Sequence, residues 1–393
     1  MRVLLVHNYY GSSAPSGENR VFEAERDLLV RHGATVRTFT RRSDEIRGKG
    51  VWGLVKGALC TVANPFAAFR LRRVLRAFRP DVVHFHNTFP LISPLAVWIV
   101  KRMGAPVVLT LHNYRLWCAA GIPLHGSQVC TRCLDSGCVW DALRHRCYRR
   151  SFLATLPLAL SIALWRHVGV WTSCVDRFVC LTSFAAGLAT RAGLPRVRLA
   201  VKGNFQPDHP HLVRSTPNRR GVLFVGRLTL EKGVSTLVAA WNRLGRGAPS
   251  LTVIGAGEAR VADEAAVSSA RVRFVGPLSH DEVLSWLAAA QLVVIPSLCY
   301  EGLPTTLVEA FMCGTPCLVS DRGPLPNLVT AGVDGAVFRA GDAKDLAAKV
   351  RGLFADPAHL AALGRGARRT YEATYTEERN YRRLMEIYQE CQA

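Results

Sequence analysis

The chain has 393 residues and carries 50 Lys and Arg residues against 29 Asp and Glu residues, a formal net charge of +21. This length suits two α/β domains, and a hydrophobic content of 49% excludes a disordered chain. No unbroken apolar run reaches the ~20 residues that span a bilayer. The first apolar run is too short for a secretory signal, so we expect a cytoplasmic protein.

The positive charge is concentrated in the first half of the chain. Residues 1–203 hold 29 Lys and Arg against 10 Asp and Glu, a net charge of +19, whereas residues 204–393 have a net charge of +2. A half this basic indicates an anionic partner, such as acidic lipid headgroups, a phosphate-bearing acceptor or nucleic acid. A solvated basic surface with no partner is the alternative.

Strand and helix patterns alternate along the first half. The spacing of apolar residues predicts a helix from residue 18 to residue 32. Short apolar runs predict strands at residues 2–7, 35–40, 81–86, 107–112 and 177–181. Such alternation predicts a parallel sheet with helices on both faces.

A second alternating series follows a proline-containing stretch, residues 206–218, that has the composition of a linker. Its patterns predict strands at 222–225, 251–254, 272–275, 292–295 and 317–320, and helices at 234–244, 281–290, 305–313, 342–354 and 377–390. We therefore expect an α/β protein of two doubly wound, Rossmann-like domains that face a cleft, each with its ligand outside the carboxyl ends of the strands. The expected domains are residues 1–203 and 204–375, with a last helix in 376–393 that packs back on the first domain.

The strongest site pattern follows a predicted strand. Pro304 suits the first turn of a helix, and the N–H groups of Thr305 and Thr306 would then be available to an anion such as a diphosphate. Glu301 and Glu309 bracket this turn. A carboxylate beside a phosphate site is best explained as an acceptor for sugar or ribose hydroxyls; the alternative is an acidic residue that complements the helix dipole.

A second site pattern follows the first strand of the second half. Gly226 permits close approach of the backbone to a ligand. Arg227 and Lys232 would project as two cations, which stabilise the negative charge that a departing diphosphate develops. The two patterns together predict a diphosphate site at this edge of the second sheet.

The stretch around Glu301 and Glu309 resembles the E-x7-E motif of glycosyltransferase family 4, the retaining enzymes of the GT-B fold, and residues 226–233 resemble that family's G-R-x3-E-K-G segment. The resemblance implies that Glu301 contacts the transferred sugar, that Glu309 binds the ribose, and that Arg227 and Lys232 hold the diphosphate. The implied nucleotide-sugar site comprises Gly17, Gly226, Arg227, Lys232, Gly302, Leu303, Pro304, Thr305, Thr306 and Glu309. The chain has no D-x-D sequence, so we expect no catalytic metal.

The first half adds two candidates of the same kind. The segment from Ala14 to Arg20 is similar to the family's glycine loop, with Ser16 in the place of one glycine and Gly17 as the candidate contact; an ordinary helix start is the alternative. His112 ends a predicted strand, and the family carries a His here that contacts the sugar, which adds His112 to Glu301, Arg227 and Lys232 as catalytic candidates.

The same half contains an unusual group of cysteines. The spacing of Cys118, Cys130, Cys133 and Cys147 matches a structural zinc tetrathiolate in an insertion at 118–147, with Cys138 extra. Disulfide or redox roles and unliganded thiols are the alternatives.

The apolar segment 151–175 favours either a buried helix or a monotopic contact with the membrane. With the basic charge around it, a monotopic contact would be a peripheral attachment to the inner face of an acidic membrane; a buried helix is the alternative. We therefore expect a retaining glycosyltransferase that uses a UDP- or GDP-sugar and a saccharide or lipid-linked acceptor, in polysaccharide or glycolipid assembly, and that binds no nucleic acid. The alternatives are an NAD-type oxidoreductase, which would need a G-x-G-x-x-G sequence after the first strand, and a basic, zinc-bearing nucleic-acid-binding protein.

Overall fold

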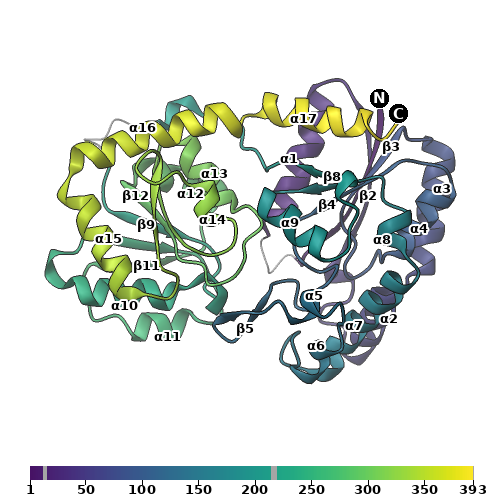
Figure 1. Cartoon of the computed structure of the whole chain (residues 1–393), viewed down its shortest axis with the longest axis horizontal. Coiled ribbons are helices and arrows are strands. Elements are labelled where there is room, and N and C mark those ends of the chain that lie inside the picture. Colours follow the sequence, from purple (N-terminus) through teal and green to yellow (C-terminus); the bar gives the residue numbers. More distant parts are fainter. Residues whose placement is uncertain (12–15, 214–218, 393) are drawn as a thin grey trace. The chain divides into compact units, whose positions relative to one another are not determined.

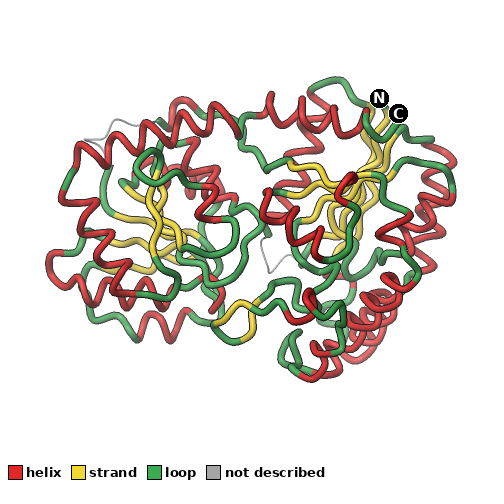
Figure 2. The backbone as a smooth tube through the Cα atoms, viewed as in Figure 1, coloured by secondary structure: helices red, strands yellow, loops and turns green. Residues whose placement is uncertain are grey.

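The computed structural model describes residues 1–11, 16–213 and 219–392 of the chain. It forms two units. Unit 1 consists of Met1–Pro123, Cys130–Gly203 and Asn380–Ala393, and unit 2 of Leu124–Val129 and Asn204–Arg379. In each unit the strands run through the middle and helices flank them (Figures 1 and 2).

Unit 1 is built on a six-stranded sheet in the order β2-β1-β3-β4-β7-β8, in which all neighbouring strands are parallel. The strands are β1 (Arg2–Tyr9), β2 (Thr35–Arg42), β3 (Val82–Asn87), β4 (Val107–Leu111), β7 (Arg177–Cys180) and β8 (Leu199–Val201). The inner strands are continuous apolar runs because both faces of a parallel sheet are covered by helices. Val3 to Val6, for example, are fully buried.

Helices follow or connect these strands. They are α1 (Gly17–Arg31), α2 (Gly50–Val62), α3 (Pro65–Phe78), α4 (Leu95–Arg102), α5 (Arg132–Asp135), α6 (Asp141–Arg144), α7 (Phe152–His167), α8 (Val170–Ser173) and α9 (Ser183–Arg191). The last helix of the chain, α17 (Glu377–Gln389), adds Leu384, Ile387 and Tyr388 to the core around β1 and α1. Tyr388 also hydrogen-bonds through its hydroxyl to His84 Nδ1 on β3, at 2.8 Å.

Unit 2 has a second parallel six-stranded sheet, in the order β11-β10-β9-β12-β13-β14. Its strands are β9 (Val222–Val225), β10 (Leu251–Ile254), β11 (Val272–Gly276), β12 (Leu292–Ile295), β13 (Cys317–Ser320) and β14 (Gly335–Phe338). Its helices are α10 (Val234–Leu244), α11 (Arg260–Ala265), α12 (His280–Ala289), α13 (Thr305–Met312), α14 (Leu325–Leu328), α15 (Ala343–Ala355) and α16 (Pro357–Thr374). The fully buried Trp241 and Phe338 lie in its core.

The predicted strands and helices are present, most with ends within one or two residues of the expected ones. The sequence analysis missed β8 and β14 and a two-stranded hairpin of β5 (Leu124–His125) and β6 (Gln128–Val129). It also missed several helices, among them α2, α3, α4, α9, α11 and α16. Residues 206–213 of the expected linker are fixed against α16 of unit 2: Asp208 forms an ion pair with Arg368, and Gln206 O accepts a hydrogen bond from the Tyr371 hydroxyl. The remainder of that stretch, 214–218, lies outside the described residues.

The strand order fixes where each unit can bind a ligand. In an open parallel sheet the strand order reverses at one point, and the loops that leave the carboxyl ends of the two strands there diverge and leave a crevice. In unit 2 this point lies between β9 and β12, and in unit 1 between β1 and β3. Among the described residues, no helix has the length and apolar character needed to cross a membrane.

Candidate active site

The two site patterns of unit 2 occupy the loops at its switch point. Residues 226–233 leave β9, and residues 296–304 leave β12 and lead into α13. A backbone hydrogen bond from Leu298 N to Glu231 O, at 2.9 Å, joins the two loops. The carboxyl ends of β9 and β12 therefore bring together residues that are about seventy positions apart in the sequence.

Lys232 and Glu301 form an ion pair at the centre of this region. Lys232 Nζ lies 2.7 Å from Glu301 Oε1, and Ser297 Oγ donates a hydrogen bond of 2.5 Å to the same oxygen. Burial disfavours the charged carboxylate, but the Lys232 ammonium and the two hydrogen bonds outweigh it and hold the pKa of Glu301 below its ordinary value. The pKa of Lys232 is raised, because the attraction of Glu301 outweighs burial. Both groups are thus charged at neutral pH and hold each other in place.

Arg227 lies on the solvent side of the same loop. Its guanidinium is about half exposed and pairs with Glu231 at 3.0 Å. An exposed pair of this kind is held weakly, so the Arg227 side chain can turn toward an incoming anion at little cost. The Lys232 side chain is therefore held in one position by Glu301, whereas the Arg227 side chain can change its conformation when an anion binds.

The helix α13 begins at Thr305, with Pro304 as the N-cap residue, one position before the first-turn place expected from the sequence. No side chain caps this N-terminus. The first N–H groups of a helix have no partner within the helix, so they are suited to bind an anion. One turn further along, Glu309 is almost fully buried, and the imidazole of His280 lies 3.9 Å from its carboxylate.

The glycines after β10 have a packing role. A Cβ at Gly255 would lie 1.9 Å from Gly226 O, and one at Gly257 would lie 2.1 Å from Leu228 O. Hydrogen bonds from Gly226 N to Ile254 O and from Leu228 N to Ala256 O join the same segments. The G-x-G sequence thus lets the β10 loop support the backbone that carries Arg227.

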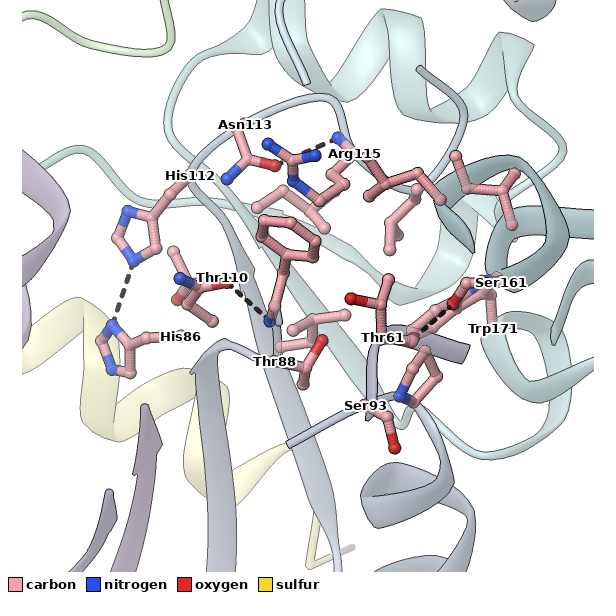
Figure 3. Close-up of a pocket in the computed structure, with 18 residues that line it drawn as sticks. Thr61, His86, Thr88, Ser93, Thr110, His112, Asn113, Arg115, Ser161 and Trp171 are labelled. Atoms are coloured by element: carbon pink, nitrogen blue, oxygen red, sulfur yellow. Dashed lines mark hydrogen bonds between the residues drawn. The ribbon is translucent and has the colours of Figure 1, made fainter. Parts of the chain in front are cut away.

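In unit 1, His112 lies at the end of β4 beside His86 of β3, as Figure 3 shows. The distance from His86 Nδ1 to His112 Nε2 is 3.0 Å, and the two rings are stacked. Burial around the ring, together with the neighbouring histidines, lowers the pKa of His112 well below its ordinary value. His112 is therefore neutral at physiological pH and can donate or accept a hydrogen bond without carrying a charge.

A buried network continues from His86 into the interior of unit 1. Glu25 Oε1 lies 3.3 Å from His86 Nε2 and 3.1 Å from His84 Nδ1, and Lys202 Nζ lies 2.8 Å from the other oxygen of Glu25. Burial opposes ionisation of Glu25, but Lys202 and the imidazoles outweigh it and hold the pKa of Glu25 well below its ordinary value. Burial, and next the proximity of His86, lowers the pKa of His84 to about 4.

Glu25, His84 and His86 also bring three ligand atoms within 4.8 Å of one another, as a metal site would. The Lys202 ammonium argues against a metal there, because a second cation next to the same carboxylate would be repelled at short range in a buried environment. We therefore describe this group as a hydrogen-bonded support for His112.

The glycine-loop candidate lies at the start of α1. Ser16 is its N-cap and accepts a hydrogen bond from Glu18 N at 3.2 Å, which explains a serine at this place. Gly17 is the first residue of the helix, and the Glu18 carboxylate accepts a hydrogen bond from Asn113 Nδ2 at 2.9 Å. This contact ties the start of α1 to the loop that carries His112. Residues Ala14 and Pro15 lie outside the described residues.

The four predicted zinc ligands all lie in unit 1. Burial, and then the nearby thiols of Cys118, Cys147 and Cys130, raises the pKa of Cys133 to about 12, so the four thiols lie near one another. In the described part of the chain, however, no three of these sulfur atoms lie within 4.8 Å of one another, whereas a tetrahedral zinc site with Zn–S of ~2.3 Å needs sulfur atoms ~3.8 Å apart. The donor set suits zinc but the spacing is wider than a closed site, and structural zinc stays a prediction.

Sequence reasoning missed several residues of these sites. Ser297 lies two residues after the predicted strand at 292–295, and no motif assigns it a role; Glu25 and Lys202 have no motif either. His84 and His86 lie in the predicted strand at 81–86, which also assigns them no role. A signal was present for the histidines, because they alternate on one strand next to the strand that ends in His112. No local signal marks Glu25 or Lys202, which reach the network from α1 and from the residue after β8.

Two family models match the chain, one for each half. The model described as "Glycosyl transferase 4-like domain" matches residues 16–205, and the model "Glycosyl transferases group 1" matches residues 219–356. The glycogen synthase of Mycobacterium tuberculosis is 30% identical over 315 residues, which cover 77% of this chain and 67% of that protein. The 2-deoxystreptamine N-acetyl-D-glucosaminyltransferase of Streptomyces fradiae is 32% identical over 332 residues, which cover 81% and 72%.

Solved structures share the fold at lower identity. Sucrose-phosphate synthase from Thermosynechococcus elongatus superposes with a TM-score of 0.69 at 17% identity, over 99% of this chain and 98% of that one. Anabaena HepE, solved in complex with UDP-glucose, gives a TM-score of 0.65 at 17% identity, over 99% and 100%. With the two parallel sheets and the matches to both halves, the chain belongs to glycosyltransferase family 4, and it is a hexosyltransferase-type enzyme of the GT-B fold.

Proposed function

We propose that the enzyme transfers a hexose from a UDP- or GDP-sugar to a saccharide or lipid-linked acceptor with retention of the anomeric configuration. The observation that carries this proposal is the Lys232–Glu301 ion pair, which lies between the loops that leave β9 and β12. The relation to HepE, which was solved with UDP-glucose, and to relatives named as glycosyltransferases supports the choice of donor.

The donor diphosphate would lie where the N–H groups of Thr305 and Thr306 meet the cations of Arg227 and Lys232. As the bond from the sugar to the diphosphate breaks, negative charge builds up on the diphosphate, and fixed cations stabilise it most at that moment. Lys232 is already held in position by Glu301. Gly226, Gly302, Leu303 and Pro304 would line the site with backbone.

The two carboxylates would bind hydroxyl groups. Glu309 would accept hydrogen bonds from the ribose, and Glu301, held ionised by Lys232 and Ser297, would accept from the transferred sugar. In unit 1, neutral His112 would hydrogen-bond the same sugar, with Gly17 close to the donor phosphate. No side chain is assigned as a general base.

In the transfer step the acceptor oxygen would form its bond to the anomeric carbon on the face from which the diphosphate departs. The diphosphate leaves with the electron pair of the broken bond. The hydroxyl proton of the acceptor passes to an oxygen of the departing diphosphate, so no further proton acceptor is required.

The test is donor binding by calorimetry with UDP-glucose and GDP-mannose, followed by NMR of the product. Lys232→Ala and Glu309→Ala should each weaken donor binding about tenfold or more, because a hydrogen bond to a charged group contributes about 1.5–3 kcal/mol. Lys344→Ala, which removes an exposed cation of α15, is the matched control. Donor binding that survives both substitutions would refute the assigned site, and a product of inverted configuration would refute retention.

The basic first half, with its net charge of +19, supports an acceptor that carries phosphate or lipid, as in polysaccharide or glycolipid assembly. The two alternative functions, an NAD-type oxidoreductase and a nucleic-acid-binding protein, receive no support from the family matches.

A further inference from the structure

The helix α2 has its large apolar residues on the outside. Its buried positions are small: Gly53, Gly57 and Thr61, one turn apart. A Cβ at Gly53 would lie 2.2 Å from Ile46 O, so this face packs as closely as backbone allows. The opposite face presents Trp52, 83% exposed, together with Val51, Val55 and Leu59. A surface helix of a water-soluble protein normally has its large apolar residues on the buried face and polar residues on the exposed face.

The neighbouring helix α7 continues this surface. It packs against α2, and Ser161 Oγ and Trp165 Nε1 donate hydrogen bonds to the carbonyl groups of Thr61 and Val62. Leu153, Leu160 and Leu164 form a row along its exposed side. At the start of α3, directly after α2, Phe66 and Phe69 are also exposed. We call these exposed residues of α2, α7 and early α3 the apolar patch.

The segments that carry the apolar patch have a strong excess of positive charge. Residues 46–80 contain eight Lys and Arg residues and no Asp or Glu, and residues 142–175 contain five Arg residues and no Asp or Glu. The exposed Lys56 lies on α2 itself, and the guanidinium of Arg73 lies over the ring of Phe69 at 4.7 Å. The nearby Glu45 is paired with Arg41, so the excess charge beside α2 is positive. An apolar surface with a cationic surround is complementary to a bilayer with anionic headgroups.

We propose that the apolar patch is a monotopic docking surface for an anionic lipid bilayer, with Trp52, Leu59 and Leu153 inserted at the interface and the flanking cations at the headgroups. A second copy of the chain fits the patch less well, because pairing patch to patch would bring together two surfaces with an excess of positive charge. The absence of a membrane-crossing helix among the described residues agrees with a surface that lies on the bilayer.

The same two helices reach the pocket next to His112. Thr61 of α2 and Leu158, Ser161 and Ile162 of α7 line that pocket together with His86 and His112, and Figure 3 shows Thr61 and Ser161 across it from the two histidines. Docking through α2 and α7 would therefore place this pocket close to the bilayer. This last step rests on the proposed function: a lipid-linked acceptor in the bilayer would then reach the enzyme at the pocket next to His112.

Vesicle co-sedimentation of the full chain tests the docking surface. With vesicles of phosphatidylcholine and phosphatidylglycerol we expect binding that weakens with added salt, and with phosphatidylcholine alone much weaker binding. The double variant Trp52→Ser/Leu59→Ser should lose about tenfold or more of the affinity, because each inserted carbon adds to binding. Lys56→Gln should lose about fivefold.

Matched controls isolate the patch. Val197→Ser removes an apolar side chain that is 85% exposed outside the patch, and Arg351→Gln removes an exposed cation of α15; both should bind vesicles as the wild type does. The proposal would be overturned if the wild-type protein did not bind anionic vesicles, or if the Trp52→Ser/Leu59→Ser variant bound them with wild-type affinity. Sedimentation velocity that shows a dimer which the same variant dissociates would also overturn it.

Slow hydrolysis of the donor in vesicle-free solution keeps the two proposals separate. The Trp52/Leu59 variant should hydrolyse UDP-glucose at the wild-type rate, since neither residue touches the donor site. Vesicle binding without any donor hydrolysis or donor binding would contradict the proposed function alone, whereas hydrolysis without vesicle binding would contradict the docking surface alone.

Discussion

His86 Nδ1 lies 3.0 Å from His112 Nε2, and Glu25 holds the far side of His86 at 3.3 Å. One of the two imidazole nitrogens donates and the other accepts, so His86 fixes both the tautomer and the orientation of His112. Glu25 is held ionised by Lys202, and its negative charge beside His86 Nε2 favours a proton on that nitrogen, which leaves His86 Nδ1 to accept from His112. His86 is thus a positioning residue for the proposed sugar contact.

Replacing His86 should therefore affect turnover more than donor affinity. His86→Phe leaves a nitrogen of His112 without its partner, and a buried unsatisfied group costs about 1–3 kcal/mol. We expect kcat to fall about tenfold with little change in the KM for the donor, and His86→Gln to restore part of the loss. Steady-state kinetics decide this; an equal loss in both variants, with a parallel drop in melting temperature, would indicate a structural role only.

The same buried network predicts that acid destabilises unit 1. The ring of His84 has a pKa of about 4 in the folded protein against 6.5 for an ordinary histidine, so the unfolded chain binds the additional proton first. Stability is therefore fully present above about pH 6.5 and falls as the pH drops toward 4. Ionised Glu25 acts in the same direction at lower pH, since its pKa is also depressed.

We expect the melting temperature to be level from pH 8 to about pH 7 and to fall steadily below about pH 6.5. Differential scanning calorimetry across this range is the measurement. In His84→Gln, which cannot gain a proton, the decline should be shallower. A wild-type melting temperature that stays constant down to about pH 5 would show that His84 is not held neutral in the folded state.

Ser297 should matter for turnover although it touches no proposed substrate group. Its hydroxyl and Lys232 Nζ both contact Glu301 Oε1, so removing the hydroxyl leaves the carboxylate less firmly oriented. For Ser297→Ala we expect kcat to fall about threefold to tenfold, in line with a net hydrogen-bond contribution of about 0.5–1.5 kcal/mol. Calorimetry should show unchanged UDP affinity; a large loss of UDP affinity would place Ser297 in the nucleotide site itself.

The cysteine group yields a direct metal prediction. If Cys118, Cys130, Cys133 and Cys147 bind zinc, the purified protein holds one zinc per chain and Cys133→Ser loses it, because a structural site needs all four ligands. Cys138→Ser, which changes an exposed thiol outside the set, should keep the metal. Elemental analysis by mass spectrometry decides, and a wild-type protein purified without chelators that contains no zinc would refute the assignment.

The strands could be predicted because buried parallel strands are continuous apolar runs that local patterns reveal. The helix α2 was not predicted, because its buried positions are two glycines and a threonine, which do not form an apolar stripe. In the site, Glu301, Lys232 and His112 were found from motifs in their own loops. The buried network behind His86 was not predicted, since Lys202 meets Glu25 across 177 positions and Tyr388 meets His84 across 304. Such contacts follow from the order of strands and from where α17 packs, which no local pattern contains.

The loop after β10 offers a test of how the donor site is supported. Gly257 lies where a Cβ would come 2.1 Å from Leu228 O, so Gly257→Ala must push the β10 loop away from the backbone that carries Arg227. Overpacking of this kind costs about 1–3 kcal/mol. We expect a melting temperature lower by several degrees and a weaker affinity for the donor diphosphate.

Gly247→Ala is the matched control, because nothing lies within 4 Å of the added Cβ. If Gly257→Ala and Gly247→Ala melt alike and bind UDP alike, the β10 loop does not support the diphosphate loop. If Gly257→Ala loses stability but keeps its UDP affinity, the close approach serves the fold of unit 2 alone. A loss of both stability and UDP affinity in Gly257→Ala alone shows that the close approach of the β10 loop to Leu228 supports the donor site.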